Sequence, residues 1–295
     1  MKLIHTAHEL GQFVQEAKAA GKTIAFVPTM GALHDGHLSL VDIAKQKADL
    51  VVVSIFVNPK QFGVNEDFDK YPRTLNEDAK LLETKNIDAL FAPSVDEVYP
   101  PEGVREQRAG VVGSTFEGAS RPGHFDGMLT VVGRLFDLVQ PDFAIFGAKD
   151  AQQVFMVKKL AGALYKDTEI VVAPTHREPS GLAMSSRNRY LTEAQKTSAT
   201  ALYKALKSLT QPLSLTLEAA RTLIDSTPET KLDYIAVVDP EIFRPVTDDY
   251  RGKALAIVAA SLRQNLDRGA PFAREVAALE KLADEAKPAG KGKGE

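Results

Sequence analysis

The sequence contains no cysteine among its 295 residues. This absence excludes disulfides, cysteine–zinc sites, iron–sulfur clusters and thiol catalysis. A charge excess is missing too, because 36 Lys and Arg stand against 39 Asp and Glu, for a formal net charge of −3. Binding along a phosphate backbone normally needs a concentrated basic surface, so we expect no nucleic acid partner.

Long apolar runs are also missing from the chain. No run approaches the roughly 20 residues that a helix needs to span a bilayer. The first ten residues, MKLIHTAHEL, carry a Glu and two His and lack the apolar stretch of a signal peptide. The hydrophobic fraction of 44% is nevertheless ample for a packed core. We therefore expect a cytoplasmic enzyme that acts on small molecules, without a membrane partner.

Apolar strands alternate with amphipathic helices through about residue 175. The expected strands cover 23–30, 50–57, 89–92, 143–146 and 169–173, and the expected helices cover 6–20, 37–48, 75–82, 129–139 and 154–164. This alternation predicts the α/β class, with a Rossmann-like parallel sheet and helices on both of its faces. Such sheets bind ligands at the carboxyl ends of their strands, where the strand order reverses.

The pattern changes after Arg189, where helices are expected from Thr192 and over 215–225, and strands over 232–238 and 254–259. This order predicts a smaller α+β domain at the C-terminus. We place the first domain at 1–182 and the second at 183–286. The remaining Gly- and Lys-rich tail, 287–295, has the composition of a disordered segment.

The segment PTMGALHDGH, residues 28–37, lies between an expected strand and an expected helix. His34 and His37 therefore fall at a helix N-terminus, where unpaired N–H groups and partial positive charge suit a phosphate. Gly31 and Gly36 would let the backbone approach a ligand closely. The alternative is a turn whose histidines only cap the helix. A zinc site is disfavoured, because no third ligand has the usual spacing.

Three further strand ends and loops carry polar groups. Lys149 and Asp150 follow one strand in GAKD, with Gln153 on the first turn of the next helix, and Asn58 and Gln61 follow another strand. A later loop contains SSRN, residues 185–188, whose hydroxyls and guanidinium could close over a triphosphate. Each segment alone could be a polar turn or a helix cap. Their common position at one edge of the sheet favours a ligand site.

Six segments together resemble the pantothenate synthetase family, within the HxGH nucleotidyltransferase superfamily. They are FVPTMGALHDGH, SIFVNPKQF, YPRT, EGASRPGHFDGM, FGAKDAQQ and REPSGLAMSSRNRYL, over about 22–191. The resemblance implies a ligase that joins pantoate to β-alanine with ATP, through a pantoyl-adenylate, and releases AMP and pyrophosphate. It also implies Mg²⁺, a homodimer and a C-terminal lid domain. Two positions depart from the family's usual acidic residue and tyrosine, Ala148 and Ala151.

The resemblance assigns roles to residues of this chain. His37 would act as an acid-like donor during adenylation, and His34, Lys149 and Arg187 would assist at the phosphates. Gln61 and Gln153 would hold pantoate, with Asn58 as a neighbour. Asp78 and Asp150 are the candidates for Mg²⁺, whose protein ligands stay unassigned. The implied ATP site comprises Met30, Gly31, Ala32, Leu33, His34, Asp35, Gly36, His37, Gly147, Ala148, Lys149, Asp150, His176, Met184, Ser185, Ser186 and Arg187.

Two other functions fit parts of the pattern. A nucleotidyltransferase of the cytidylyltransferase kind shares the HxGH motif but leaves the nucleotide on its product. A non-catalytic nucleotide-sensing module would bind ATP without turnover. An aminoacyl-tRNA synthetase is disfavoured, because 295 near-neutral residues leave little room for a tRNA-binding body.

Overall fold

The structure, a computed structural model, describes residues 1–64 and 66–262 together with the backbone of 273–280. Its largest element is a six-stranded sheet in which every pair of neighbouring strands is parallel. The strand order is β1 (Lys2–Ile4), β4 (Ala89–Phe91), β3 (Leu50–Ile55), β2 (Ile24–Thr29), β5 (Phe143–Gly147) and β6 (Glu169–Ala173). The predicted Rossmann-like parallel sheet is confirmed. The sequence reading missed β1, whose three residues are too few to show a periodicity.

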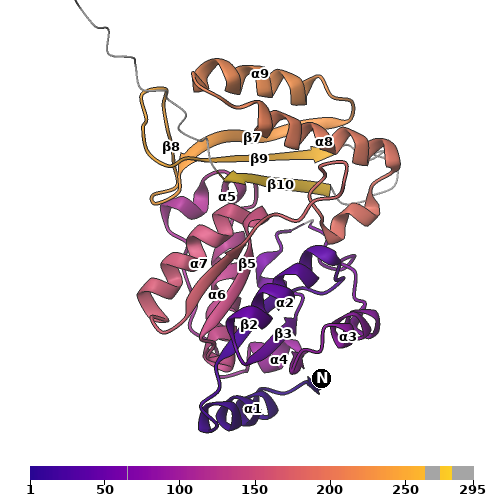
Figure 1. The fold of residues 1–295 in the computed structure, drawn as a ribbon, viewed down its shortest axis with the longest axis vertical. Helices are drawn as coiled ribbons and strands as arrows, with labels where there is room; N and C mark the ends of the chain where they lie inside the picture. The colour runs from indigo at the N-terminus through magenta and orange to yellow at the C-terminus, as the bar shows by residue number, and fades with distance from the viewer. Residues whose placement is uncertain (65, 263–272, 281–295) are drawn as a thin grey trace, which may run out of the picture.

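Helices cover both faces of this sheet (Figure 1). One face packs against α1 (Ala7–Ala19), α6 (His124–Val139) and α7 (Ala151–Leu164), and the other against α2 (Asp35–Lys47) and α3 (Leu75–Thr84). Alternation along β2 explains both cores, since Phe26 points into the first and Val27 into the second. Burying such a side chain contributes about 1.5–3 kcal/mol.

Helix starts are set by local capping. Thr6 with Glu9, and Thr192 with Gln195, form capping boxes, as the sequence spacing predicted. The helix expected at 37–48 instead begins at Asp35, because His34 occupies the N-cap and accepts a hydrogen bond from the Gly36 N–H. The helices expected from 129 and 154 likewise begin earlier, at His124 and Ala151. Two short helices, α4 (Val95–Val98) and α5 (Glu117–Ser120), complete this N-terminal unit.

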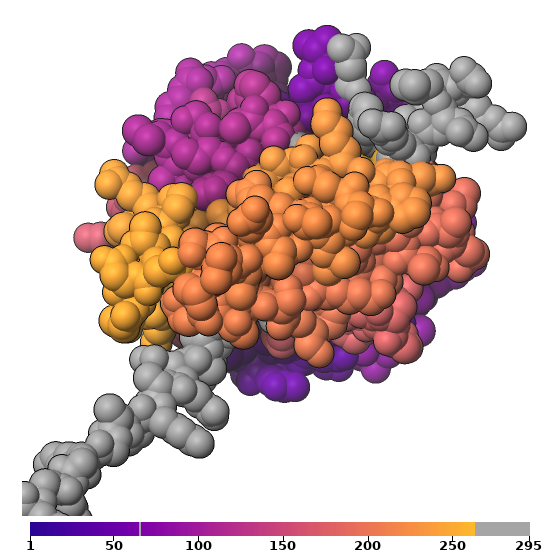
Figure 2. Space-filling view, turned by 90° about the horizontal axis from the view of Figure 1, so that it is seen from above, coloured from indigo at the N-terminus to yellow at the C-terminus, as the bar shows by residue number. Residues whose placement is uncertain are grey.

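A second, antiparallel sheet forms the C-terminal unit, in the order β10 (Ala273–Glu280), β9 (Leu255–Leu262), β7 (Thr230–Asp239) and β8 (Arg244–Pro245). Helices α8 (Glu193–Ser208) and α9 (Leu213–Asp225) pack on one of its faces. Its other face contributes Ile257, which packs with Ala151 of the N-terminal unit. The predicted α+β character is confirmed, and Figure 2 shows this unit lying over the N-terminal one. The tail 287–295 lies outside the described residues, and the 182/183 boundary stays a prediction.

Strand order reverses between β2 and β5, since β3 and β4 follow β2 on one side while β6 follows β5 on the other. Ligands of such sheets bind at the carboxyl ends of the strands at this point. The loops after β2 and β5 therefore lie where a site is expected. Within the described part of the chain, no helix is long and apolar enough to cross a membrane.

Candidate active site

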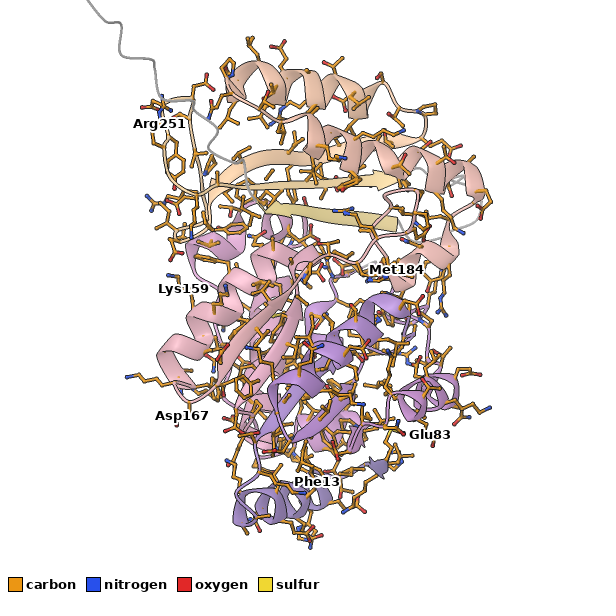
Figure 3. The ribbon with its side chains drawn as sticks, in the orientation of Figure 1. Phe13, Glu83, Lys159, Asp167, Met184 and Arg251 are labelled. Carbon is orange, nitrogen blue, oxygen red and sulfur yellow. The ribbon has the colours of Figure 1, made fainter. Side chains whose placement is uncertain are left out.

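A pocket opens at the carboxyl ends of β2, β3, β5 and β6, below the C-terminal unit. Figure 3 shows Met184, one of its lining residues, at the junction of the two units. The loop segments that were expected to share a site thus meet in one cavity. The predicted site residues that line it are Met30, His34, Gly36, His37, Asn58, Gln61, Gly147, Lys149, Asp150, Gln153, His176, Met184, Ser185, Ser186 and Arg187.

The loop after β2 is shaped by Asp78 of α3, whose carboxylate is buried. Its Oδ2 accepts from the Ala32 N–H at 2.9 Å and its Oδ1 from the Leu33 N–H at 2.7 Å. Thr74 Oγ1 donates to the same carboxylate at 3.2 Å. Gly31 adopts a φ of +82°, and an added Cβ would lie 3.1 Å from Asp78 Oδ2. Asp78 therefore holds the loop, and both of its carboxylate oxygens are already hydrogen-bonded within the protein.

The two histidines lie against each other on the first turn of α2. Their ring centroids are 4.1 Å apart, with 39° between the ring planes. His34 Nδ1 accepts from the Gly36 N–H at 3.1 Å, so the neutral ring carries its proton on Nε2. His34 thus caps the helix through its Nδ1, which leaves Nε2 as the nitrogen that could donate to a ligand. His37 Nδ1 is buried and has no hydrogen-bond partner among the described residues.

Both rings are held neutral. Desolvation, followed by the positive charge of Lys149, lowers the pKa of His34 to about 4. Desolvation, followed by the neighbouring His34 and Lys149, lowers the pKa of His37 to about 3. At neutral pH the ligand-free pocket therefore presents imidazole N–H groups and not imidazolium ions.

The loop after β3 brings two amides to the pocket. Asn58 Nδ2 donates to Gln61 Oε1 at 3.0 Å and to the Gly127 carbonyl at 3.2 Å. Its Oδ1 accepts from Tyr99 Oη at 2.7 Å and from the Lys60 N–H at 3.2 Å. The Asn58 amide is therefore used within the protein. It orients Gln61, whose Nε2 lies 3.2 Å from Met30 Sδ. A direct contact of Asn58 with substrate stays a prediction.

The end of β5 supplies a cation and a carboxylate. Lys149 Nζ lies 3.3 Å from Asp150 Oδ1, and both side chains line the pocket. Asp150 occupies the N-cap position of α7 but makes no capping hydrogen bond with its side chain. The capping alternative for Asp150 is therefore wrong, and about half of its side chain remains exposed. Gln153, on the first turn of α7, faces the same cavity.

The loop before α8 crosses the pocket and is tied to the opposite wall. Ser186 Oγ donates to the Ala32 carbonyl at 2.9 Å, and the Met184 N–H donates to the His176 carbonyl at 3.0 Å. Arg187 makes two hydrogen bonds, each 2.9 Å long, with the Asp67 carboxylate. Burial opposes the charge of Arg187, but the ion pair with Asp67 raises its pKa above the usual range.

Five residues expected in the ATP site do not line the pocket. Ala32 and Leu33 are turned inward by their bonds to Asp78, and Gly31 lies between that carboxylate and Ile55. Asp35 is exposed on the first turn of α2, while Ala148 is buried behind Gly147. These residues are Gly31, Ala32, Leu33, Asp35 and Ala148.

The sequence reading missed one wall of the pocket. Apolar side chains of α6 line it, although their helical stripe indicated only a core helix. Tyr71 also lines the pocket, with the Arg187 guanidinium 5.3 Å above its ring. The YPRT segment was the available signal for Tyr71. The α6 residues of this wall are Met128, Val131, Val132 and Leu135.

Comparisons with known proteins agree with this geometry. A family model described as pantoate-beta-alanine ligase matches residues 2–266. A pantothenate synthetase of Acidothermus cellulolyticus is 49% identical over 262 residues, which cover 86% of each chain. One of Thermotoga neapolitana is 45% identical over 267 residues, covering 88% of this chain and 95% of the other.

Solved structures give the same result. The crystal structure of pantothenate synthetase from Thermus thermophilus superposes with a TM-score of 0.85 at 41% identity, covering 95% of this chain and 99% of that one. A pantoate-beta-alanine ligase from Francisella tularensis, complexed with beta-gamma ATP and beta-alanine, gives 0.79 at 34% identity, covering 95% and 97%. The chain belongs to the pantoate-beta-alanine ligase family.

Proposed function

We propose that the chain joins pantoate to β-alanine with ATP as co-substrate, and that the reaction occurs in the pocket between the two units. The observation that carries the proposal is the convergence of the His34–His37 pair, Lys149, Arg187 and the Gln61 and Gln153 amides on one cavity. The cavity thus combines cationic and imidazole groups with neutral amides. This combination suits an anionic nucleotide beside a hydroxy acid.

The chemistry needs two steps. A carboxylate oxygen is a poor leaving group, so the pantoate carboxylate first attacks the α-phosphorus of ATP and expels pyrophosphate. The resulting mixed anhydride has AMP as its leaving group. The β-alanine amine then attacks the acyl carbon, the amide forms and AMP departs. With no cysteine in the chain, the acyl group has no thiol to travel on and is carried by phosphate.

We assign the phosphate side to the loop after β2. The first turn of α2 presents backbone N–H groups, and His34 offers an Nε2–H. Because both histidines are neutral in the free enzyme, each donates through a single ring N–H. Charge that develops on the phosphoryl oxygens strengthens the hydrogen bond from His37, so it acts as the acid-like donor in the transition state without transferring its proton. Lys149 and Arg187 supply the fixed positive charge.

We assign the pantoate side to the other wall. Gln61 and Gln153 each offer a donor and an acceptor for hydroxyls and a carboxylate without imposing a charge. Asn58 acts by holding Gln61 through its 3.0 Å hydrogen bond. The apolar side chains of α6 fit the two methyl groups of pantoate, since a pocket that orients a ligand combines an apolar wall with few polar groups.

We propose that Mg²⁺ enters with ATP and takes Asp150 as its protein ligand. Asp150 suits this role because its carboxylate is half-exposed in the pocket. The carboxylate of Asp78, in contrast, accepts hydrogen bonds from two backbone N–H groups. No group of three or more His, Asp or Glu that could hold a metal occurs among the described residues. A site with one carboxylate and substrate phosphates is typical of Mg²⁺, which would neutralise charge on the phosphates.

We also propose a homodimer that works in the cytoplasm, where ATP is available. Seven large apolar side chains of the N-terminal unit are exposed, and covering some of them would favour association of two copies. Sedimentation at the mass of two chains would support the dimer, and sedimentation at the mass of one would contradict it. The exposed residues are Met1, Leu3, Val64, Leu81, Val95, Val111 and Leu164.

Product analysis tests the proposed reaction. With ATP, Mg²⁺, pantoate and β-alanine, we expect one AMP, one pyrophosphate and one amide for each ATP consumed. Release of pyrophosphate without AMP, with the nucleotide retained on the product, would indicate the cytidylyltransferase-type alternative. ATP binding without turnover would indicate the nucleotide-sensing module.

A further inference from the structure

Two consecutive acidic residues, Glu66 and Asp67, bind two different arginines, Arg121 and Arg187. Asp67 accepts from Arg187 Nε and Nη2, each at 2.9 Å. Glu66 accepts from Arg121 Nε at 2.8 Å and from Arg121 Nη2 at 2.6 Å. Both contacts are bidentate, the geometry that gives an arginine–carboxylate pair its strength and fixed orientation. We call the two adjacent carboxylates the Glu66–Asp67 bridge.

The pairs of this bridge are shielded from solvent. The side chains of Asp67 and Arg187 are 6% and 23% exposed, and those of Glu66 and Arg121 are 23% and 14% exposed. Salt screens such pairs less than it screens surface pairs. Removing Asp67 would leave the charge of Arg187 partly buried without compensation, whereas Arg121 would keep Glu117 as a second partner, 3.5 Å from its Nη1. The bidentate geometry nevertheless orients each arginine toward its carboxylate of the bridge.

One end of the bridge reaches the pocket directly. Arg187 lines the cavity beside Tyr71, whereas Asp67 lies behind it and lines no part of the cavity. The carboxylate holds the Nε–Nη2 edge of the guanidinium, and no described residue accepts a hydrogen bond from Nη1. Asp67 therefore holds one edge of the guanidinium and leaves Nη1 as the group that could bind a phosphate of the nucleotide.

The other end reaches the pocket through two residues. Arg121 Nη1 lies 3.2 Å from His124 Nε2, and His124 Nδ1 lies 2.8 Å from the Gln61 carbonyl. The Gln61 carbonyl can only accept a hydrogen bond, and the Arg121 guanidinium can only donate one. The neutral His124 ring therefore carries its proton on Nδ1, donates it to the Gln61 carbonyl and accepts from Arg121 at Nε2. Arg121 Nη2 also lies 3.4 Å from the same carbonyl. The Glu66 pair thus positions Gln61, on the pantoate side.

The two ends cannot move independently. Consecutive Cα atoms are about 3.8 Å apart, so a shift of Asp67 that follows Arg187 also shifts Glu66. The neighbouring Val64 is 94% exposed, whereas Phe68 packs against Phe62. The ion pairs are the side-chain contacts that tie Glu66 and Asp67 themselves to Arg121 and Arg187.

We infer that the Glu66–Asp67 bridge couples the two halves of the pocket, so that the position of the nucleotide-side arginine and the position of the pantoate-side amide depend on each other. Glu66 and Asp67 are positioning residues, since neither lines the cavity. The inference rests on the proposed function, which places ATP at Arg187 and pantoate at Gln61. It extends that function by making the binding of the two substrates interdependent.

Cross-effects between the two sides test the coupling. Calorimetric titration with β,γ-methylene ATP and, separately, with pantoate would compare wild type, Glu66→Gln and Asp67→Asn. We expect Glu66→Gln to weaken binding of the ATP analogue about threefold to tenfold, although Glu66 contacts no nucleotide-side residue except through Asp67. We expect Asp67→Asn to weaken pantoate binding by a similar factor.

The matched control is Asp69→Asn, a change of the same kind at an exposed carboxylate in the same segment, which should leave both affinities unchanged. If each substitution weakened only the ligand on its own side, the coupling would be overturned. If Asp67→Asn failed to fold, the titration of Glu66→Gln with the ATP analogue would decide alone. Failure of the wild type to bind either ligand would instead overturn the proposed function.

Discussion

His34 and His37 stack on the first turn of α2 with their ring centroids 4.1 Å apart, and neither ring is charged in the free enzyme. His34 uses its Nδ1 to cap the helix, which leaves its Nε2–H as a donor. Burial and the charge of Lys149 thus produce a pair of neutral donors. This arrangement differs from a surface HxGH turn, in which both rings would titrate near pH 6.5.

Truncation of His37 tests the catalytic role of the pair. His37→Ala should lower the rate of adenylation by about 10²–10³, because it removes a preorganised donor to the transition state. The fold should persist, since the ring makes no hydrogen bond through Nδ1 within the described residues. Rapid-quench measurement of pyrophosphate release, with circular dichroism as the folding check, gives the answer. Release by the folded variant at near the wild-type rate would refute the assignment.

Gly36 provides a test that separates site geometry from stability. A Cβ at this position would lie 2.8 Å from His34 Cε1 and 2.9 Å from its Nδ1, so Gly36→Ala should displace the ring and lower kcat. Alanine also favours a helix by up to about 1 kcal/mol over glycine, so the melting temperature should not fall. Gly162→Ala, in α7 with no atom within 4 Å of its added Cβ, is the matched control and should keep full activity. Equal kcat for both variants would contradict the proposed contact.

The two acidic candidates for Mg²⁺ should behave differently. Asp78→Asn leaves a backbone N–H of the loop without its acceptor, which should cost about 1–3 kcal/mol of unfolding free energy. Its Mg²⁺ dependence should match that of the wild type. Asp150→Asn should instead require more Mg²⁺ for half-maximal rate, with little change in stability. Titration of activity with Mg²⁺, paired with urea denaturation, distinguishes the two, and the reverse pattern would make Asp78 the ligand.

Acid should destabilise the fold before the carboxylates titrate. Desolvation lowers the pKa of His34 to about 4, of His37 to about 3 and of His124 to about 4. In the unfolded chain these rings titrate near pH 6.5, so below that pH the unfolded state binds more protons. The free energy of unfolding should therefore decline as pH falls from about 6.5 to about 4.

Urea midpoints at several pH values in this window measure the decline. In the double variant His34→Gln/His37→Gln, the unfolding free energy should depend less steeply on pH, because up to about two fewer protons are taken up on unfolding. Identical slopes for wild type and double variant would show that these two rings are not held neutral.

Much of the fold could be predicted because its signals are local. The apolar run of residues 50–57 predicts the strand that forms β3, and the spacing of Thr6 and Glu9 predicts the capping box of α1. Glycine and polar residues at the ends of β2 and β5 located the site, since parallel strands bring those ends to one edge. Strands β8 and β10 were not predicted, because pairing in the antiparallel sheet decides them and no periodicity in the sequence does.

The site contacts that could not be predicted from the sequence join residues that are far apart in the chain. Asp78 lies 46 residues from Ala32, and nothing near either residue in the chain shows that they bond. Arg187 and Asp67 are separated by 120 residues, so their ion pair exists only after folding. Asn58 was read as a substrate ligand because its amide type fits one. Only the structure shows that Tyr99 and Gln61 already satisfy it.

The central claim is that this pocket makes an acyl-adenylate from pantoate. Exchange of labelled pyrophosphate into ATP, measured with pantoate and Mg²⁺ but without β-alanine, tests it most directly. We predict exchange that requires pantoate and does not require β-alanine. Exchange without pantoate, or none until β-alanine is added, would contradict the account.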